Sequence, residues 1–129
     1  MGEMDMKKFD LEQRFIDFAV CIIDISAGLE NSKAGNHVGG QLLRAGTSPA
    51  LNYGEAQSAE SRKDFVHKMK IVLKELRETQ VGLKIIEQAH LLKSTNQLST
   101  ANKECNELIA ICVKSIETAV RNMNIEAKS

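Results

Sequence analysis

Five basic residues on one predicted helix could together bind phosphate groups. They are spaced by seven, four, three and seven positions, which places them within roughly 80° of one helical face: Lys63, Lys70, Lys74, Arg77 and Lys84. We call this set the basic stripe, and His67 lies close to it. Such a line of cations can follow the phosphate backbone of RNA or DNA. The alternative is a solvated helix surface on which Glu78 and Glu87 dilute the charge, and the net charge of zero leaves both interpretations open.

Eight further polar residues fall on two helical faces, and we call them the polar set. Four follow one another in steps of four, four and three, and the other four share a quadrant of the next predicted helix: Arg44, Ser48, Asn52 and Glu55, then Asp64, Lys68, Glu75 and Glu78. We favour an interhelical or intersubunit network that fixes the register of the helices. A ligand site is the alternative, but a bundle with so few aromatic residues offers no obvious pocket.

No pattern in the sequence supports catalysis or metal binding. Glu87 and His90 match the Glu-x-x-His element of di-iron bundles, but the second such element is missing. The three histidines lack zinc-site spacing, and Ser48 lies in GTSPA rather than GxSxG. Cys105 and Cys112 lie two turns apart on one predicted helix, too far apart for a disulfide. We therefore predict no enzyme activity, no metal, no cofactor and reduced cysteines.

Composition indicates one helical domain over residues 1–129. Apolar residues make up 43% of the chain and aromatic residues only 4%, with one proline and no tryptophan, which favours helices over strands. The 17 basic and 17 acidic residues balance, so binding to nucleic acid would need a local patch. No apolar run approaches the roughly 20 residues of a membrane span, and no signal-peptide core is present. We expect a cytoplasmic protein that does not bind membranes.

Apolar residues at alternating steps of three and four predict four helices, at about 10–30, 37–59, 61–92 and 96–123. Short connections between helices of this length predict an all-α, antiparallel up-and-down four-helix bundle. Pro49 removes a backbone donor, so the second helix should be kinked or broken there, with Ser48 as a local cap. The first and fourth helices each carry two apolar stripes, more than one core requires. This surplus predicts a ring-like homo-oligomer.

The segment 41–83 carries a more specific pattern, QLLR-x-x-x-S-x-x-x-N-x-x-E-A, then S-x-x-D-F-x-x-K, then E-x-x-E-T. The matching residues are Gln41, Leu42, Leu43, Arg44, Ser48, Asn52, Glu55, Ala56, Ser61, Asp64, Phe65, Lys68, Glu75, Glu78 and Thr79. This pattern resembles the signature of the bacterial four helix bundle protein family, which includes proteins encoded in intervening sequences of 23S ribosomal RNA genes. The family often has a Trp-Leu pair after Glu-Thr, whereas this chain has Gly82 in place of the aromatic residue.

The resemblance implies a homopentameric bundle that is often labelled a ribosomal protein. It also extends to the accessory protein of diversity-generating retroelements, which binds nucleic acid and a reverse transcriptase. Two functional hypotheses follow. The first is a non-enzymatic, oligomeric accessory protein associated with RNA or other nucleic acid and related to the ribosome. The second is a structural adaptor for a protein partner such as a reverse transcriptase, without direct nucleic-acid contact.

Overall fold

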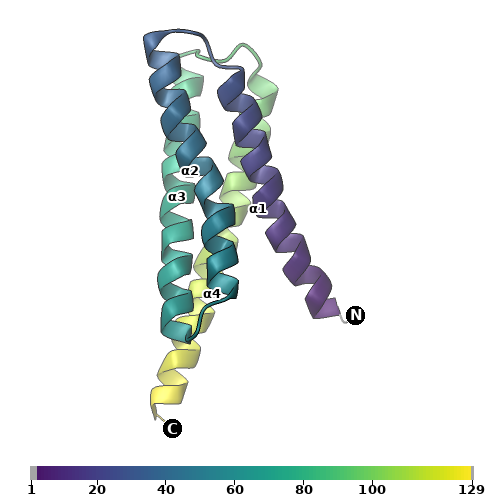
Figure 1. Cartoon of the computed structure of the whole chain (residues 1–129), viewed down its shortest axis with the longest axis vertical. Helices are drawn as coiled ribbons and strands as arrows, with labels where there is room; N and C mark the ends of the chain where they lie inside the picture. The colour runs from purple at the N-terminus through teal and green to yellow at the C-terminus, as the bar shows by residue number, and fades with distance from the viewer. Residues whose placement is uncertain (1–2, 129) are drawn as a thin grey trace.

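The computed structural model describes residues 3–128, with side chains described for residues 10–128, and consists of four helices. They are α1 (Glu3–Ala27), α2 (Lys33–Gln57), α3 (Arg62–Gln88) and α4 (Thr95–Lys128). The helices run alternately up and down with short connections at the two ends of the molecule (Figure 1). The prediction of an all-α, antiparallel four-helix bundle is confirmed. Within residues 3–128, no helix is both long enough and apolar enough to cross a membrane.

The predicted apolar stripes meet in one core. Each helix contributes large side chains that are almost completely buried, and the most enclosed of them are Phe15, Ile22, Ile25, Leu42, Met69, Leu76, Leu83, Ile86, Leu98 and Leu108. The rings of Phe15 and Tyr53 pack with their centroids 4.9 Å apart and link α1 to α2. Burying this apolar surface is the main favourable contribution to folding.

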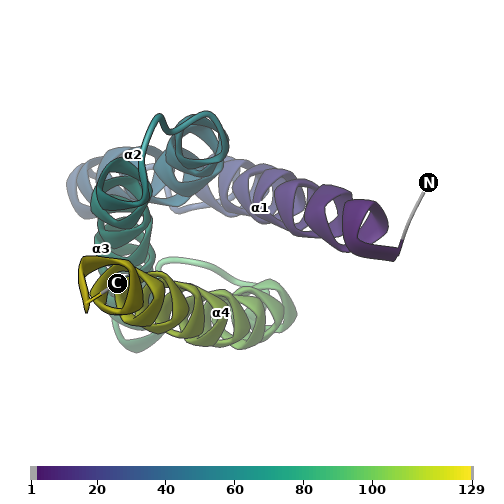
Figure 2. The same ribbon diagram turned by 90° about the horizontal axis from the view of Figure 1, so that it is seen from below.

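The helices are unevenly packed around this core. α3 packs closely against both α2 and α4, and α1 packs closely against α2. α1 meets α4 over a much smaller area, and its N-terminal end diverges from the bundle (Figures 1 and 2). The seam between α1 and α4 is therefore the most open side of the molecule.

Glycine allows α1 and α2 to approach closely. A Cβ atom placed on Gly46 would lie 2.5 Å from Cγ2 and 2.9 Å from Cβ of Ile22. A Cβ on Gly39 would lie 3.1 Å from the end of Leu29. The spacing of these two helices thus depends on the missing side chain of Gly46.

Several helix ends differ from the predicted ones. α1 begins at Glu3 rather than near Asp10, because residues 3–9 are mostly good helix formers and include no glycine or proline. α2 begins at Lys33, since Ser32 caps it by accepting a hydrogen bond from the Gly35 amide. α4 continues to Lys128, five residues past the predicted end, and Arg62 pairs with Glu126 in this extension at 2.7 Å.

The break predicted near Pro49 is not observed, because α2 is continuous from Lys33 to Gln57. Ser48 does not act as a helix cap. Its hydroxyl and carbonyl oxygens instead accept hydrogen bonds from the Asn52 side chain within the same helix. Proline still removes one backbone donor, so a kink within the continuous helix stays a prediction.

α3 ends earlier than predicted, at Gln88 instead of residue 92. His90 has a φ of 56°, in the left-handed region, and so turns the chain after the helix. The turn brings Leu91 back into the core and lets its carbonyl oxygen accept a hydrogen bond from the Glu30 amide. This hydrogen bond joins the connection between α1 and α2 to the connection between α3 and α4.

Candidate functional site

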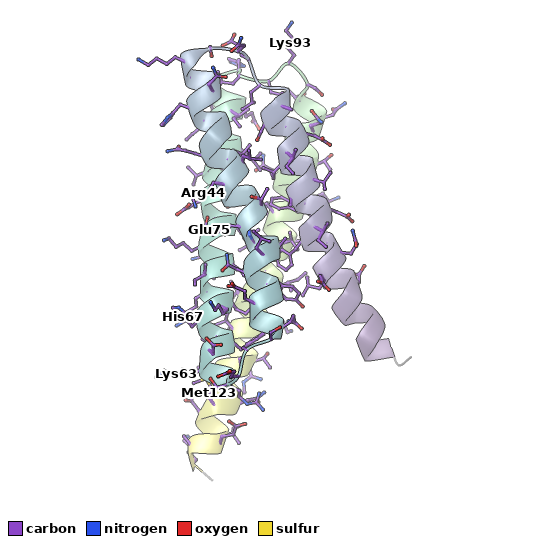
Figure 3. The ribbon with its side chains drawn as sticks, in the orientation of Figure 1. Arg44, Lys63, His67, Glu75, Lys93 and Met123 are labelled. Atoms are coloured by element: carbon purple, nitrogen blue, oxygen red, sulfur yellow. The ribbon has the colours of Figure 1, made fainter. Side chains whose placement is uncertain are left out.

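The basic stripe lies on the outer face of α3, opposite the face that enters the core. All five of its side chains are exposed: Lys63, Lys70, Lys74, Arg77 and Lys84. Among the side chains of residues 10–128, none of the five forms an ion pair, in contrast to Arg14, Arg44 and Arg62. Figure 3 shows Lys63 and exposed His67 near the start of α3.

Two apolar side chains interrupt the basic stripe toward the end of α3. Val81 is 56% exposed and Ile85 is 47% exposed, and the helical period puts both on the same face as Lys74 and Arg77. The outer face of α3 is thus basic in its first part and mixed basic and apolar in its second. Large apolar side chains left in water in this way often mark a contact surface.

Arg44 joins α2 to α3 through two carboxylates. Its Nη1 atom lies 3.1 Å from Oε2 of Glu75, and its Nη2 atom lies 2.8 Å from Oε2 of Glu78. Figure 3 places Arg44 and Glu75 side by side where the two helices meet. The hydrogen bond to Glu78, and then the charge of Glu75, raise the pKa of Arg44 above its ordinary value. Because Glu75 is only 8% exposed, it depends on Arg44 for charge compensation.

The rest of the polar set is only partly brought together. Lys68 of α3 pairs with Glu55 of α2 at 3.2 Å, a second link between these helices. Ser48 and Asn52 bond to each other within α2. The carboxylate of Asp64 makes no bond to α2 among the described side chains, although its backbone amide donates to the Ser61 cap. The interhelical part of the set is therefore Arg44, Glu55, Lys68, Glu75 and Glu78.

A groove of about 650 Å³ lies between α2 and α3, and we call it the α2/α3 groove. Its lining combines apolar residues with four cationic residues and one acidic residue: Val38, Gln41, Leu42, Arg44, Ala45, Lys70, Leu73, Lys74, Arg77, Glu78, Val81, Gly82 and Ile85. The prediction that the bundle offers no obvious pocket was wrong. Small residues create the space: Gly82 has no side chain, and a Cβ there would lie 3.1 Å from Leu42 Cδ1.

Sequence reasoning missed a second ionic cluster, between α1 and α4. The Nη2 atom of Arg14 lies 2.6 Å from Oε1 of Glu104 and 2.8 Å from Oε2 of Glu107. The hydrogen bond from Arg14 is the main reason why the pKa of Glu104 falls below its ordinary value. Arg14 and Glu104 are 90 positions apart, so no local spacing could have revealed the pair. This cluster bridges the open seam.

The described residues hold no metal-binding cluster, and the Glu-x-x-His element lies on the surface. Within residues 10–128, no group of three or more histidine, cysteine or acidic side chains could hold a metal ion. Glu87 and His90 of the Glu-x-x-His element are both exposed, and His90 lies beyond the end of α3. Burial raises the pKa of Cys105 and of Cys112 to about 12, so both thiols stay protonated and are poor nucleophiles. Cys105 donates to the Leu76 carbonyl oxygen at 3.2 Å, as a core residue.

Comparison with known proteins relates most of the bundle to one family. The model of the family described as 23S rRNA-intervening sequence protein matches residues 7–114. A crystal structure from Bacteroides thetaiotaomicron, described as a protein of unknown function from the S23 ribosomal protein family, is 30% identical in sequence. Its similarity covers 82% of this chain and 97% of that one, with a TM-score of 0.76. No curated protein matches the chain.

Proposed function

The chain belongs to the 23S rRNA-intervening sequence protein family, and from this premise we propose that it is a non-enzymatic, oligomeric accessory protein that binds RNA through the basic stripe of α3. The family description and that of the similar crystal structure both point to a ribosome-related protein. DNA, as another polyanion, is a second ligand that the stripe suits. The cytoplasm is the compartment in which we expect this function.

One observation supports the proposal most strongly: the basic stripe is both exposed and unpaired. Its members are Lys63, Lys70, Lys74, Arg77 and Lys84, and none of them forms an ion pair with a carboxylate within residues 10–128. Arg44 and Arg14 lie near acidic residues that compensate their charge. Five cations at heptad-like spacing on one rod-like helix create a positive field that the zero net charge of the chain conceals.

The chemistry of the basic stripe also predicts how it would bind. Lysine side chains contact phosphates as point charges and release counterions, so the affinity should fall steeply as salt increases. They fix the position of the nucleic-acid backbone without distinguishing base edges, so sequence preference should be weak. In an oligomer several stripes would act together, which raises the overall affinity without any new contact.

Reversing two charges of the basic stripe tests the proposal. We expect the variant Lys70→Glu/Lys74→Glu to lose binding to a fluorescently labelled RNA in anisotropy titrations at low salt. A matched control, Lys103→Glu/Lys114→Glu, makes the same change of charge at two exposed lysines of α4 and should keep binding. Each lost phosphate contact should reduce the log–log salt slope by about 0.7 to 0.9.

Two results would refute nucleic-acid binding by the stripe. One is a wild-type protein that shows no salt-sensitive binding to RNA or DNA at low ionic strength. The other is equal loss of binding in the two double variants, since this would reflect total charge rather than the position of the charge. Circular dichroism and light scattering on both variants would show that helicity and assembly are unchanged.

Self-association is the second element of the proposal, and apolar residues on the outside of α1 and α2 support it. Ile16, Val20 and Ile23 follow one another at helical spacing on α1, and all are more than 40% exposed. Leu43 of α2 is exposed as well and lines a shallow groove together with Ile23. We propose that this α1/α2 face is a subunit interface, and the family resemblance suggests five subunits.

A structural adaptor for a protein partner, such as a reverse transcriptase, is the competing function. The exposure of Val81 and Ile85 within the basic stripe favours it, because a purely electrostatic surface would not require apolar side chains. An adaptor of this kind would bind an acidic and apolar protein surface and show no affinity for RNA. The titrations above separate the two functions.

A further inference from the structure

We propose that the α2/α3 groove receives an unstacked base of single-stranded RNA, while Lys70, Lys74 and Arg77 hold the neighbouring phosphates. The inference rests on the proposed function and adds a substrate class to it, namely single-stranded rather than double-stranded RNA. It is carried by three features of the groove: its shape, the position of the stripe residues and the fixed guanidinium of Arg44.

The groove has the size and the surface that a base requires. Its volume of about 650 Å³ lies within the range of small-molecule sites. Val38, Leu42 and Ala45 of α2 face Val81 and Ile85 of α3 across it. Gly82 leaves space between the two walls, where any larger residue would press against Leu42. A flat base can bury its apolar faces in such a slot.

The basic stripe runs along one side of this groove. Lys70, Lys74 and Arg77 line the groove and also belong to the stripe, so a phosphate backbone that follows the stripe passes the groove opening. Nucleotides are linked flexibly through their sugars, so a base next to a bound phosphate can turn toward the protein. The charge of the lining agrees with this, since it combines four cationic side chains with the single carboxylate of Glu78.

Arg44 supplies a flat polar surface within the groove. Its guanidinium is fixed by two carboxylates, at 3.1 Å from Glu75 and 2.8 Å from Glu78, yet its side chain remains 62% exposed. Unstacked RNA bases commonly stack on arginine guanidinium planes in protein complexes. The amide of Gln41 and the carboxylate of Glu78 can form hydrogen bonds with the edge of the base.

A duplex cannot use the groove in this way. In double-stranded RNA the bases are stacked and paired inside the helix, and proteins contact mainly phosphates and 2′-hydroxyl groups. A duplex would meet the basic stripe but leave the groove empty. The structure therefore predicts a preference for single strands that comes from the groove, added to a salt-dependent affinity that comes from the stripe.

Substitution at Gly82 tests the inference. We expect Gly82→Trp to fill the groove and to weaken binding of a labelled oligouridylate about tenfold, the value of roughly one base-stacking interaction. Binding of a duplex RNA of equal length should not change, and neither should the salt slope, because the phosphate contacts remain. Gly82→Ala is the matched control, since its methyl group requires the end of Leu42 to shift by only a few tenths of an ångström and leaves most of the groove open.

A second variant keeps the test decisive if Gly82→Trp does not fold. Arg44→Lys retains the positive charge beside Glu75 and Glu78 but removes the guanidinium plane. We expect it to weaken oligouridylate binding several-fold and to leave duplex binding unchanged. Circular dichroism on each variant reports whether the bundle is intact.

The possible outcomes separate this inference from the proposed function. Equal affinity of wild-type protein for single strands and duplex, or unchanged oligouridylate binding by both Gly82→Trp and Arg44→Lys, overturns the groove as a base site and leaves the stripe intact. Absence of any salt-sensitive RNA binding overturns both. If an acidic amphipathic peptide binds instead and Gly82→Trp blocks it, the groove is a protein-docking site and the inference is wrong.

Discussion

Replacing Gly46 with alanine should destabilise the bundle, although alanine is the better helix former. The new Cβ would lie 2.5 Å from Cγ2, 2.7 Å from Cγ1 and 2.9 Å from Cβ of Ile22. Ile22 is fully buried, and its Cβ is bonded directly to the backbone, so rotating the side chain cannot relieve all three contacts. α1 and α2 would have to move apart by about 1 Å to restore ordinary van der Waals distances.

The magnitude follows from two opposing effects. Alanine in a helix interior is favoured over glycine by about 1 kcal/mol. Overpacking a well-filled core costs about 1–3 kcal/mol, and three contacts below 3.0 Å put this site near the upper end. The net loss should be about 2 kcal/mol. For a chain of this size that corresponds to a decrease in Tm of about 8 °C.

Thermal and urea unfolding followed by circular dichroism, at one fixed protein concentration, would measure this effect. Gly40→Ala is the matched control, because no atom lies within 4 Å of a Cβ at that position. It should raise the free energy of unfolding by about 1 kcal/mol. In an Ile22→Ala background the contacts with Cγ1 and Cγ2 disappear and only the 2.9 Å contact with Cβ remains, so Gly46→Ala should destabilise much less. The reasoning is refuted if Gly46→Ala alone is as stable as the wild type.

Two other predictions concern acid stability and assembly. Arg14 lowers the pKa of Glu104 in the folded state. The pair therefore stabilises the protein at pH values above the pKa of a glutamate in the unfolded chain, about 4.3, and this stabilisation is lost as the pH falls through the pKa of the folded state. Glu104→Gln should therefore show a smaller loss of stability than the wild type on acidification below about pH 4.3, and equal losses in the two proteins would contradict this. Light scattering should give a mass well above the 14.3 kDa of one chain, and Ile16→Asp/Val20→Asp should lower it while leaving helicity unchanged. A wild-type protein that is monomeric at micromolar concentration would rule out the proposed α1/α2 interface.

The helices could be predicted from the sequence because their information is local. Residues such as Phe15, Ile22 and Ile25 recur at helical spacing, and the structure buries all three. The exposed face of α3 follows from the same periodicity. The buried and exposed faces both follow from the 3.6-residue period of one helix, and this period can be recognised within a single continuous segment of the sequence.

Helix ends were less predictable because several residues compete for the same role. Asp10 is a good cap in isolation, but the residues before it continue the helix to Glu3. Ser32 lies within a polar run that resembles a turn, yet it is the actual cap of α2. Pro49 predicts a break from its own chemistry, whereas the surrounding helix remains continuous.

The groove and the Arg14 cluster could not be predicted because they depend on contacts between distant segments. The groove exists where the missing side chain of Gly82 on α3 faces Leu42 on α2, so its depth depends on how two helices are aligned. The pairing of Arg14 with Glu104 requires the antiparallel register of α1 and α4. The absence of an aromatic residue at position 82 was the one local signal that pointed to the groove.

The open seam between α1 and α4 has a consequence for folding. α1 is held mainly by α2, and α4 is held mainly by α3, so the two helices beside the seam each have one main neighbour. Elements with few buried contacts to their neighbours open first in local unfolding, so the bundle should open at this seam, where α1 and α4 touch least. The hinge between Ala27 and Lys33 is short, and the α2 surface that α1 leaves can accept the same helix from another copy. We expect that opening at the seam would allow two copies to associate by exchanging α1, with each α1 packing on the α2 of the other copy.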